Sequence, residues 1–180
     1  MRVSVYIGIS LDGYIARADG DIDWLMAADT SDGSDDYGYK AFSDSVDCMI
    51  MGRNTFEKVL SFPEWPYVGK RLIVLSRTLK ALPVELEECV VLYSGSIIEL
   101  VKQLENEGCQ RLYIDGGETI QSFLNEGLIT DLSITRVPVL LGEGLSLFGK
   151  TKQDIQLKHI STKTFKNGFV QSIYGVVNEV

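Results

Sequence analysis

Residues 49–57 read Met-Ile-Met-Gly-Arg-Asn-Thr-Phe-Glu, and the rest of the chain is best interpreted outward from this stretch. The apolar run before Gly52 predicts a buried strand, and Asn54 followed by Glu57 predicts a capping box on a helix. Glycine at such a junction lets a ligand approach the backbone, and Arg53 would stand at the positive end of the helix. The combination favours an anion site, although a plain strand-to-helix turn would use the same residues.

The same order of elements occurs a second time. Residues 112–121 read Leu-Tyr-Ile-Asp-Gly-Gly-Glu-Thr-Ile-Gln, so that a strand, two adjacent glycines and a helix follow one another. Adjacent glycines can expose backbone N–H groups to a pyrophosphate, although Gly-Gly alone is more often just a turn. Arg77, at the end of another predicted strand, could hold a further phosphate such as the 2′-phosphate of NADP, or be a solvated arginine. Two such junctions in one small chain favour a dinucleotide ligand, which carries several phosphates.

Strand-like and helix-like segments alternate along the chain without a repeat or a linker, which predicts one α/β domain over residues 1–180. Asn167-Gly168 separates two β-rich runs and predicts a C-terminal hairpin, which makes the sheet mixed. Pro138 predicts an edge or a bulge in the last long strand before it. The predicted strands are 2–10, 46–51, 71–75, 90–93, 111–114, 129–141, 155–165 and 169–177. The predicted helices are 54–60, 97–107 and 118–126. Ser96 is expected to cap the second of these helices and Gly108 to end it.

Charge is distributed unevenly in this sequence. The chain has 17 Lys and Arg against 25 Asp and Glu, and its formal net charge is −8. This balance argues against a nucleic-acid binder and against a basic membrane-surface protein. Residues 11–36 contain no predicted strand, and seven Asp but no Lys or Arg lie from Asp19 to Asp36, which is typical of a solvated loop or a pair of short turns.

Localisation and redox state follow from what the sequence lacks. The N-terminal apolar stretch meets acidic residues with no cleavage site, and no apolar run approaches the roughly 18 residues of a membrane span. Cys48, Cys89 and Cys109 are an odd, widely spaced set without a CxxC pair. We therefore expect a cytoplasmic protein with reduced thiols and, with a single histidine, no transition-metal site.

One motif in the sequence is misleading. Residues 144–151 match G-x-x-x-x-G-K-[ST], the phosphate-binding P-loop, which needs a helix immediately after it. The residues after Thr151 instead alternate with period two and enter the predicted hairpin, and Leu145, Leu147 and Phe148 within the motif are typical of core anchors. We interpret the segment as an ordinary loop. A P-loop NTPase would instead bind Mg-ATP through Lys150.

Taken together, these segments resemble the dihydrofolate reductase superfamily over nearly the whole chain. The most specific similarity is that of residues 50–57 to the pattern I-M-G-R-x-T-[WF]-E. Residues 10–13 and 138–142 resemble one branch in particular, the reductase domain of riboflavin biosynthesis and the small stand-alone bacterial proteins grouped with it. That branch reduces 5-amino-6-(5-phosphoribosylamino)uracil. Further similar segments are 72–76, 114–124 and 132–137.

The resemblance implies a dihydrofolate reductase-like three-layer fold, with a mixed central sheet, helices on both faces and a C-terminal hairpin. It also implies hydride transfer from NADPH to a C=N or C=O bond of a small pyrimidine-like or pterin-like substrate, and a homodimer. Trp24 would close a mobile loop over the site, and Tyr39 would lie on the substrate side. The implied NADPH contacts are Gly52, Arg53, Asn54 and Thr55 for phosphates and ribose, Ser76, Arg77 and Thr78 for the 2′-phosphate, Gly116, Gly117, Glu118, Thr119 and Ile120 for the pyrophosphate, and Gly8, Ile9 and Ser10 for the nicotinamide amide.

The substrate acid is where the sequence departs from the resemblance. The carboxylate of dihydrofolate reductase falls near Gly38, where this chain has none, although Asp35 and Asp36 are close. The missing carboxylate makes dihydrofolate reductase proper a less favoured alternative. A second alternative is a non-catalytic NADP-binding protein with the same fold. The acidic stretch beside the implied site also favours a neutral or cationic substrate over a phosphorylated one.

A reductase needs a general acid to supply the second hydrogen. Asp12 is the first candidate because it directly follows the nicotinamide-side strand, although it could instead stabilise a turn. Tyr37 is the next candidate, together with Thr135 acting through a bound water. His159 is not a candidate, because it is in period with apolar residues of the terminal hairpin.

Overall fold

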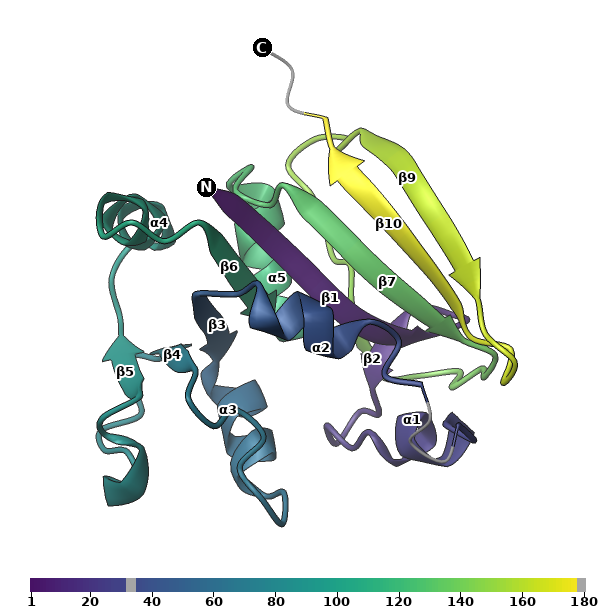
Figure 1. Cartoon of the computed structure of the whole chain (residues 1–180), viewed down its shortest axis with the longest axis horizontal. Helices are drawn as coiled ribbons and strands as arrows, with labels where there is room; N and C mark the ends of the chain where they lie inside the picture. Colours follow the sequence, from purple (N-terminus) through teal and green to yellow (C-terminus); the bar gives the residue numbers. More distant parts are fainter. Residues whose placement is uncertain (32–34, 178–180) are drawn as a thin grey trace.

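The computed structural model describes residues 1–31 and 35–177, and an eight-stranded sheet forms its centre (Figure 1). Six neighbouring strands run parallel, and the last two continue the sheet antiparallel. Across the sheet the order is β5 (Val90–Tyr93), β4 (Arg71–Leu75), β3 (Cys48–Gly52), β6 (Arg111–Asp115), β1 (Arg2–Ser10), β7 (Asp131–Val137), β10 (Val170–Val176) and β9 (Leu157–Thr164). The predicted α/β class, mixed sheet and C-terminal hairpin are confirmed.

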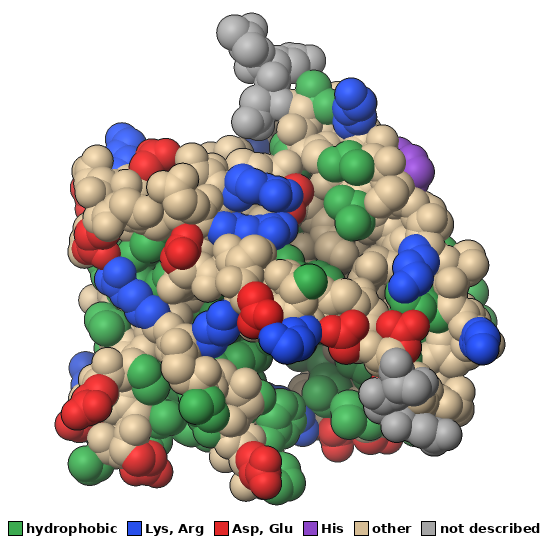
Figure 2. Space-filling view, in the orientation of Figure 1, with side chains coloured by type: hydrophobic (Ala, Val, Ile, Leu, Met, Phe, Trp, Pro, Cys, Tyr) green, Lys and Arg blue, Asp and Glu red, His purple; other side chains and the backbone are tan. Residues whose placement is uncertain are grey.

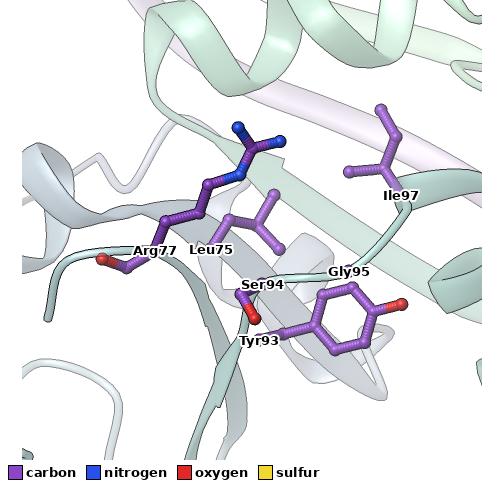
Figure 3. A pocket seen from close by; sticks show the side chains of 7 residues that line it. Leu75, Arg77, Tyr93, Ser94, Gly95 and Ile97 are labelled. Atoms are coloured by element: carbon purple, nitrogen blue, oxygen red, sulfur yellow. The ribbon is translucent and has the colours of Figure 1, made fainter. Parts of the chain in front are cut away.

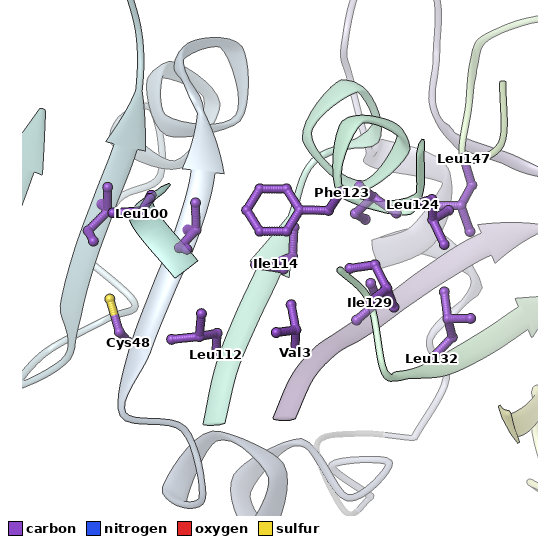
Figure 4. Packing of buried hydrophobic residues seen from close by; sticks show 14 of the residues in the cluster. Val3, Cys48, Leu100, Leu112, Ile114, Phe123, Leu124, Ile129, Leu132 and Leu147 are labelled. Carbon is purple, nitrogen blue, oxygen red and sulfur yellow. The ribbon is translucent and has the colours of Figure 1, made fainter. Parts of the chain in front are cut away.

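Helices cover both faces of the sheet and create three layers. Successive side chains of a strand point to opposite faces, so Val3 and Val5 of β1 enter one core while Tyr6 packs against the other. In the first core, Phe123 and Leu100 cover the sheet (Figure 4), and each such buried side chain contributes roughly 1.5–3 kcal/mol. The first core lies under α4 (Ile97–Asn106) and α5 (Gly117–Asn125), and the second under α2 (Tyr39–Asp44) and α3 (Arg53–Leu60).

The helix ends agree only in part with the sequence. Gly108 follows α4 with a φ of +94°, as a C-terminal glycine should. Ser96 is the residue before α4, but its side chain makes no capping hydrogen bond to the described residues. The predicted capping box of Asn54 and Glu57 is wrong, because α3 begins one residue earlier and Asn54 already lies inside it. The carboxylate of Glu57 pairs instead with Arg53, at 3.3 Å.

The stretch of residues 11–36 holds more structure than predicted. It contains α1 (Asp23–Ala28) and a three-residue strand, β2 (Tyr14–Ala16), so the prediction of no second strand is wrong. This strand pairs with β8 (Leu145–Ser146), about 130 residues away, which local patterning does not reveal. Residues 32–34 of the stretch lie outside the described residues. The predicted strand 129–141 is shorter, because β7 ends at Val137, directly before Pro138.

The remaining segments agree with the sequence for the most part. Residues 144–151 form a loop that contains β8, and the segment after them leads into strand β9, as an ordinary loop would. Of the core anchors expected in this loop, Leu147 is buried, but Leu145 and Phe148 are exposed. His159 is exposed on β9, with Nε2 2.7 Å from the Thr162 hydroxyl. The three cysteines are free. Among the described residues, no helix has the length and apolar character needed to cross a membrane. A 3₁₀ turn, η1 (Val84–Leu86), precedes β5.

Candidate active site

The carboxyl ends of the six parallel strands gather the residues singled out in the sequence. Strand β6 lies between β1 and β3, although it follows them in the chain, so the direction of strand addition reverses there. Ligands of open α/β sheets bind outside the carboxyl ends of the strands at such a reversal. Here Ser10, Gly52 and Asp115 end the three strands concerned.

The two strand–glycine–helix junctions fit into each other. A Cβ atom on Gly52 would lie 3.0 Å from the Thr119 hydroxyl, and one on Gly116 would collide with the Thr55 hydroxyl. Gly116 has a φ of +90°, which other residues rarely adopt. The amino ends of α3 and α5 therefore lie side by side, and no described side chain caps either of them. Their unpaired N–H groups form a place suited to an anion.

The end of β4 is a third element that presents a group suited to binding phosphate, next to the amino ends of α3 and α5. Arg77 is exposed beside a hollow of about 230 Å³ between the ends of β4 and β5 (Figure 3). Its neighbour Ser76 accepts the N–H groups of Thr78 and Leu79, at 3.2 and 2.9 Å, and so shapes the turn that carries Arg77. The hollow is lined by Leu75, Ser76, Arg77, Tyr93, Ser94, Gly95 and Ile97.

A polar network lies where Gly8 pairs with Thr135 across β1 and β7. Gln171 Nε2 donates to the Thr135 hydroxyl and to the Tyr37 carbonyl, both at 3.1 Å. The Tyr6 hydroxyl donates to the same carbonyl at 2.7 Å, and burial raises the pKa of Tyr6 to about 12. Thr135 is thus a hydrogen-bonded side chain held in place by Gln171.

Helix α1 covers this network with Leu25 and not with Trp24. Leu25 lies over Gly8, where a Cβ would approach its Cδ1 to 3.3 Å. Trp24, which was expected to close the site, is 4% exposed and packs with Val137 and Phe169. Because Gly8 has no side chain, Leu25 can pack directly over strand β1 at this position.

Asp12 serves to hold loops together. Its carboxylate accepts hydrogen bonds from the Ser10 hydroxyl at 2.6 Å and from the N–H groups of Leu141 and Gly142 at 3.2 and 2.8 Å. These hydrogen bonds, that of Ser10 first, lower the pKa of Asp12. A carboxyl group that is ionised so readily is a poor proton donor near neutral pH. Its contacts fit the turn-stabilising alternative.

Tyr37 and the nearby acids are also engaged in local structure. Tyr37 has a φ of +56°, and its hydroxyl contacts Asp29 at 2.5 Å and Asn167 at 2.8 Å. Burial, followed by the bond to Asp29, raises the pKa of Tyr37, which weakens it as an acid. Asp35 accepts the Tyr37 N–H and Asp36 accepts the N–H of Gly38, both at 2.9 Å, so these carboxylates shape the turn before α2.

Asp115 is the acid that the sequence analysis missed. It ends β6, directly before Gly116, and burial raises its pKa to about 6. Among the described residues, the Gly116 N–H donates a hydrogen bond to its Oδ1, at 2.8 Å. Burial first, and the charge of Asp115 second, raise the pKa of three surrounding tyrosines, Tyr39, Tyr67 and Tyr113. The sequence did contain a sign of this acid, because Asp115 is a carboxylate at the carboxyl end of a predicted buried strand. It was missed because the motif around it was interpreted only for its two glycines.

The residues present fit a dinucleotide phosphate. Glycine at both junctions, uncapped amino ends of α3 and α5, and an exposed Arg77 at the next strand end are the features such a ligand needs. Arg53 lies at the same edge, although its guanidinium pairs with Glu57 at 3.3 Å. An acid with a raised pKa stands beside these junctions.

Comparison with known proteins places this site in a family. The sequence matches the RibD C-terminal domain over residues 2–171, and the chain belongs to that family. It is 36% identical to the uncharacterized protein YwjB of Bacillus subtilis, over 91% of this chain and 92% of that protein. It is 30% identical to the uncharacterized protein YyaP of the same organism, over 96% and 94% of the two chains.

Solved structures agree with this assignment. A putative riboflavin biosynthesis protein from a Shewanella species is 40% identical and superposes with a TM-score of 0.92, over 99% of this chain and all of that one. A Thermotoga maritima diaminohydroxyphosphoribosylaminopyrimidine deaminase/5-amino-6-(5-phosphoribosylamino)uracil reductase has a TM-score of 0.75 at 15% identity, over 98% of this chain and 56% of that one. The fold is therefore the dihydrofolate reductase-like fold of the RibD reductase domain.

Proposed function

We propose that this protein is an NADPH-dependent reductase that transfers hydride to a C=N or C=O bond of a small planar heterocycle, of the pyrimidine or pterin kind. The observation that carries the proposal is the meeting of the two uncapped glycine–helix junctions with the protonatable Asp115 at one edge of the sheet. Membership in the RibD C-terminal family supports it.

Each element would have a separate part in binding. The amino ends of α3 and α5, from Gly52 and Gly116 onward, would hold the phosphates, and Arg77 would hold the 2′-phosphate. The backbone of Gly8, Ile9 and Ser10 would face the nicotinamide, under the cover of Leu25. Bound there, NADPH supplies the hydride. Holding donor and acceptor carbons in contact is the main contribution that the protein makes to such a step.

The second hydrogen must come as a proton. We assign it to the Asp115 carboxyl group, because its pKa of about 6 leaves it partly protonated at neutral pH. Tyr39 and Tyr67 lie near it and would pack against the ring of a planar substrate. Addition of hydride to carbon and of this proton to nitrogen or oxygen completes the reduction, and the carboxylate left behind recovers its proton from solvent.

The test has a binding part and a turnover part. We expect NADPH to quench protein fluorescence, and its own nicotinamide emission to change, at lower concentrations than NADH. We also expect NADPH oxidation with at least one member of a panel of pyrimidines, pterins and dicarbonyl compounds. Equal binding of the two nucleotides, or none, contradicts the cofactor. Tight NADPH binding without any turnover would instead favour a non-catalytic NADP-binding protein.

We also propose that the protein works as a cytoplasmic homodimer. Strand β9 is the outer edge of the sheet, and all eight of its residues are exposed, which leaves an unpaired edge for a second copy. The free cysteines suit a reducing compartment. Sedimentation velocity checks the assembly, and a monomeric mass at micromolar concentration rejects it.

A further inference from the structure

A cleft lies between α1 and the carboxyl end of α3. Its volume is about 570 Å³, and Ile22, Met26, Phe62 and Pro63 supply its apolar lining. Met26 is 70% exposed, so a large apolar side chain faces solvent there. Figure 2 shows the molecule hollowed between these two parts of the chain, with hydrophobic side chains along the hollow. Covering such surface with an apolar ligand group is favourable.

The same two helices connect this cleft to the candidate active site. Helix α3 begins at the Gly52 junction and ends beside the cleft. Helix α1 lays Leu25 over Gly8 and presents the next residue, Met26, to the cleft. A substrate whose reacting ring lies near β1 would therefore extend its remaining part between α1 and α3.

The charges on the cleft are mostly negative. Asp21, Asp23 and Glu64 line it together with one cation, Lys58. The Lys58 ammonium lies 3.3 Å from Asp21, and Arg17 pairs with Asp23 at 2.6 Å, so Glu64 supplies the unbalanced negative charge of the lining. A phosphate monoester carries a charge of about −1.5 to −2 at pH 7 and would meet no unpaired cation there.

We propose that this cleft binds an apolar part of the substrate that carries no phosphate, so that the protein discriminates against phosphoribosyl compounds of the kind named for the Thermotoga relative. Describing the occupant as part of a substrate rests on the proposed reductase function. The selectivity of the cleft rests on its lining alone, and the experiment separates the two.

The experiment uses the methionine methyl groups as reporters. The chain has four methionines, and Met49 and Met51 are buried in the sheet, while Met26 lines the cleft. In protein labelled with ¹³C-methyl methionine, the NMR signal lost in Met26→Leu identifies Met26. Benzyl alcohol, benzylamine and phenyl phosphate are then titrated separately in 0.1 M salt. We expect the first two to shift the Met26 signal saturably and phenyl phosphate to bind at least tenfold more weakly, with Met49 and Met51 unmoved.

Two matched variants test whether charge causes the difference. Glu64→Gln removes one negative charge from the lining, and Glu64→Lys replaces that negative charge with a positive one. We expect phenyl phosphate to bind progressively more tightly in the two variants, while benzyl alcohol binds all three proteins alike. The proposal is overturned if phenyl phosphate binds the unaltered protein as tightly as benzyl alcohol, if no probe shifts Met26 saturably, or if the variants leave phosphate binding unchanged.

The titrations need neither NADPH nor turnover. A chain that shows the expected probe selectivity but never binds NADPH would contradict the reductase function and leave the cleft selectivity standing. A chain that binds NADPH but prefers phenyl phosphate would contradict the cleft selectivity and leave the reductase function standing.

Discussion

The Thr55 hydroxyl of α3 stands where a Cβ atom of residue 116 would be, so that the helix of one glycine junction fills the space left open by the other. Gly116 also has a φ of +90°. Two separate requirements, space and conformation, therefore call for glycine at this position. The contact ties α3 to the β6–α5 turn and fixes how the two helix amino ends face a shared ligand.

Gly116→Ala is expected to lower the free energy of unfolding by about 2–4 kcal/mol, since it adds a steric clash to an unfavourable φ. Gly127→Ala is the matched control, because Gly127 has a φ of +65° with open space around it. We expect Gly127→Ala to lower the free energy of unfolding by about 1 kcal/mol. Urea unfolding measures both. Thr55→Ala should restore part of the loss at residue 116 in a double-mutant cycle, and equal losses for the two glycines would refute the close approach.

Arg77→Ala is expected to abolish the preference for NADPH over NADH and to leave the fold intact, since its guanidinium is exposed at the rim of the hollow. A hydrogen bond to a charged group contributes about 1.5–3 kcal/mol, which corresponds to roughly ten- to a hundredfold in NADPH affinity. Nicotinamide fluorescence titrations measure it. Lys80→Ala, a nearby exposed cation, controls for general electrostatics. Unchanged selectivity in Arg77→Ala would show that the 2′-phosphate binds elsewhere.

Asp115→Asn is expected to stabilise the protein at pH 7. Burial raises the pKa of Asp115 from 3.8 to about 6, so between these values the folded chain holds the proton that the unfolded chain releases. The free energy of unfolding therefore falls as the pH rises from about 4 to about 6, and the contribution of Asp115 to this fall is up to about 3 kcal/mol. Urea unfolding should show Asp115→Asn more stable than the parent at pH 7 and no different at pH 3. Asp154→Asn, at an exposed position, is the matched control for the loss of one carboxylate and should change the free energy of unfolding little.

The sequence predicted what depends on local pattern. The buried strands, the glycine that ends α4 and the hairpin at Asn167-Gly168 all follow from residue type and period. It missed β2, because three residues carry no period and their partner at Ser146 lies far along the chain. It favoured Asp12 over Asp115 for a related reason: position in the chain is readable, whereas the burial that changes a pKa is created by tertiary packing.

The contrast between these two carboxylates yields the most discriminating prediction for catalysis. With Asp115 as the general acid, turnover should be highest below about pH 6 and fall about tenfold per pH unit above it, because the proton must be present before transfer. Asp115→Asn should lower kcat and flatten this profile. Asp12→Asn should weaken the Leu141–Gly142 contact and lower thermal stability, yet keep the parent pH profile. The measurement is NADPH oxidation from pH 5 to 9 with whichever substrate the panel supplies. If the pH profile survives in Asp115→Asn and disappears in Asp12→Asn, Asp12 rather than Asp115 is the proton donor, because replacing the donor removes its ionisation from the profile.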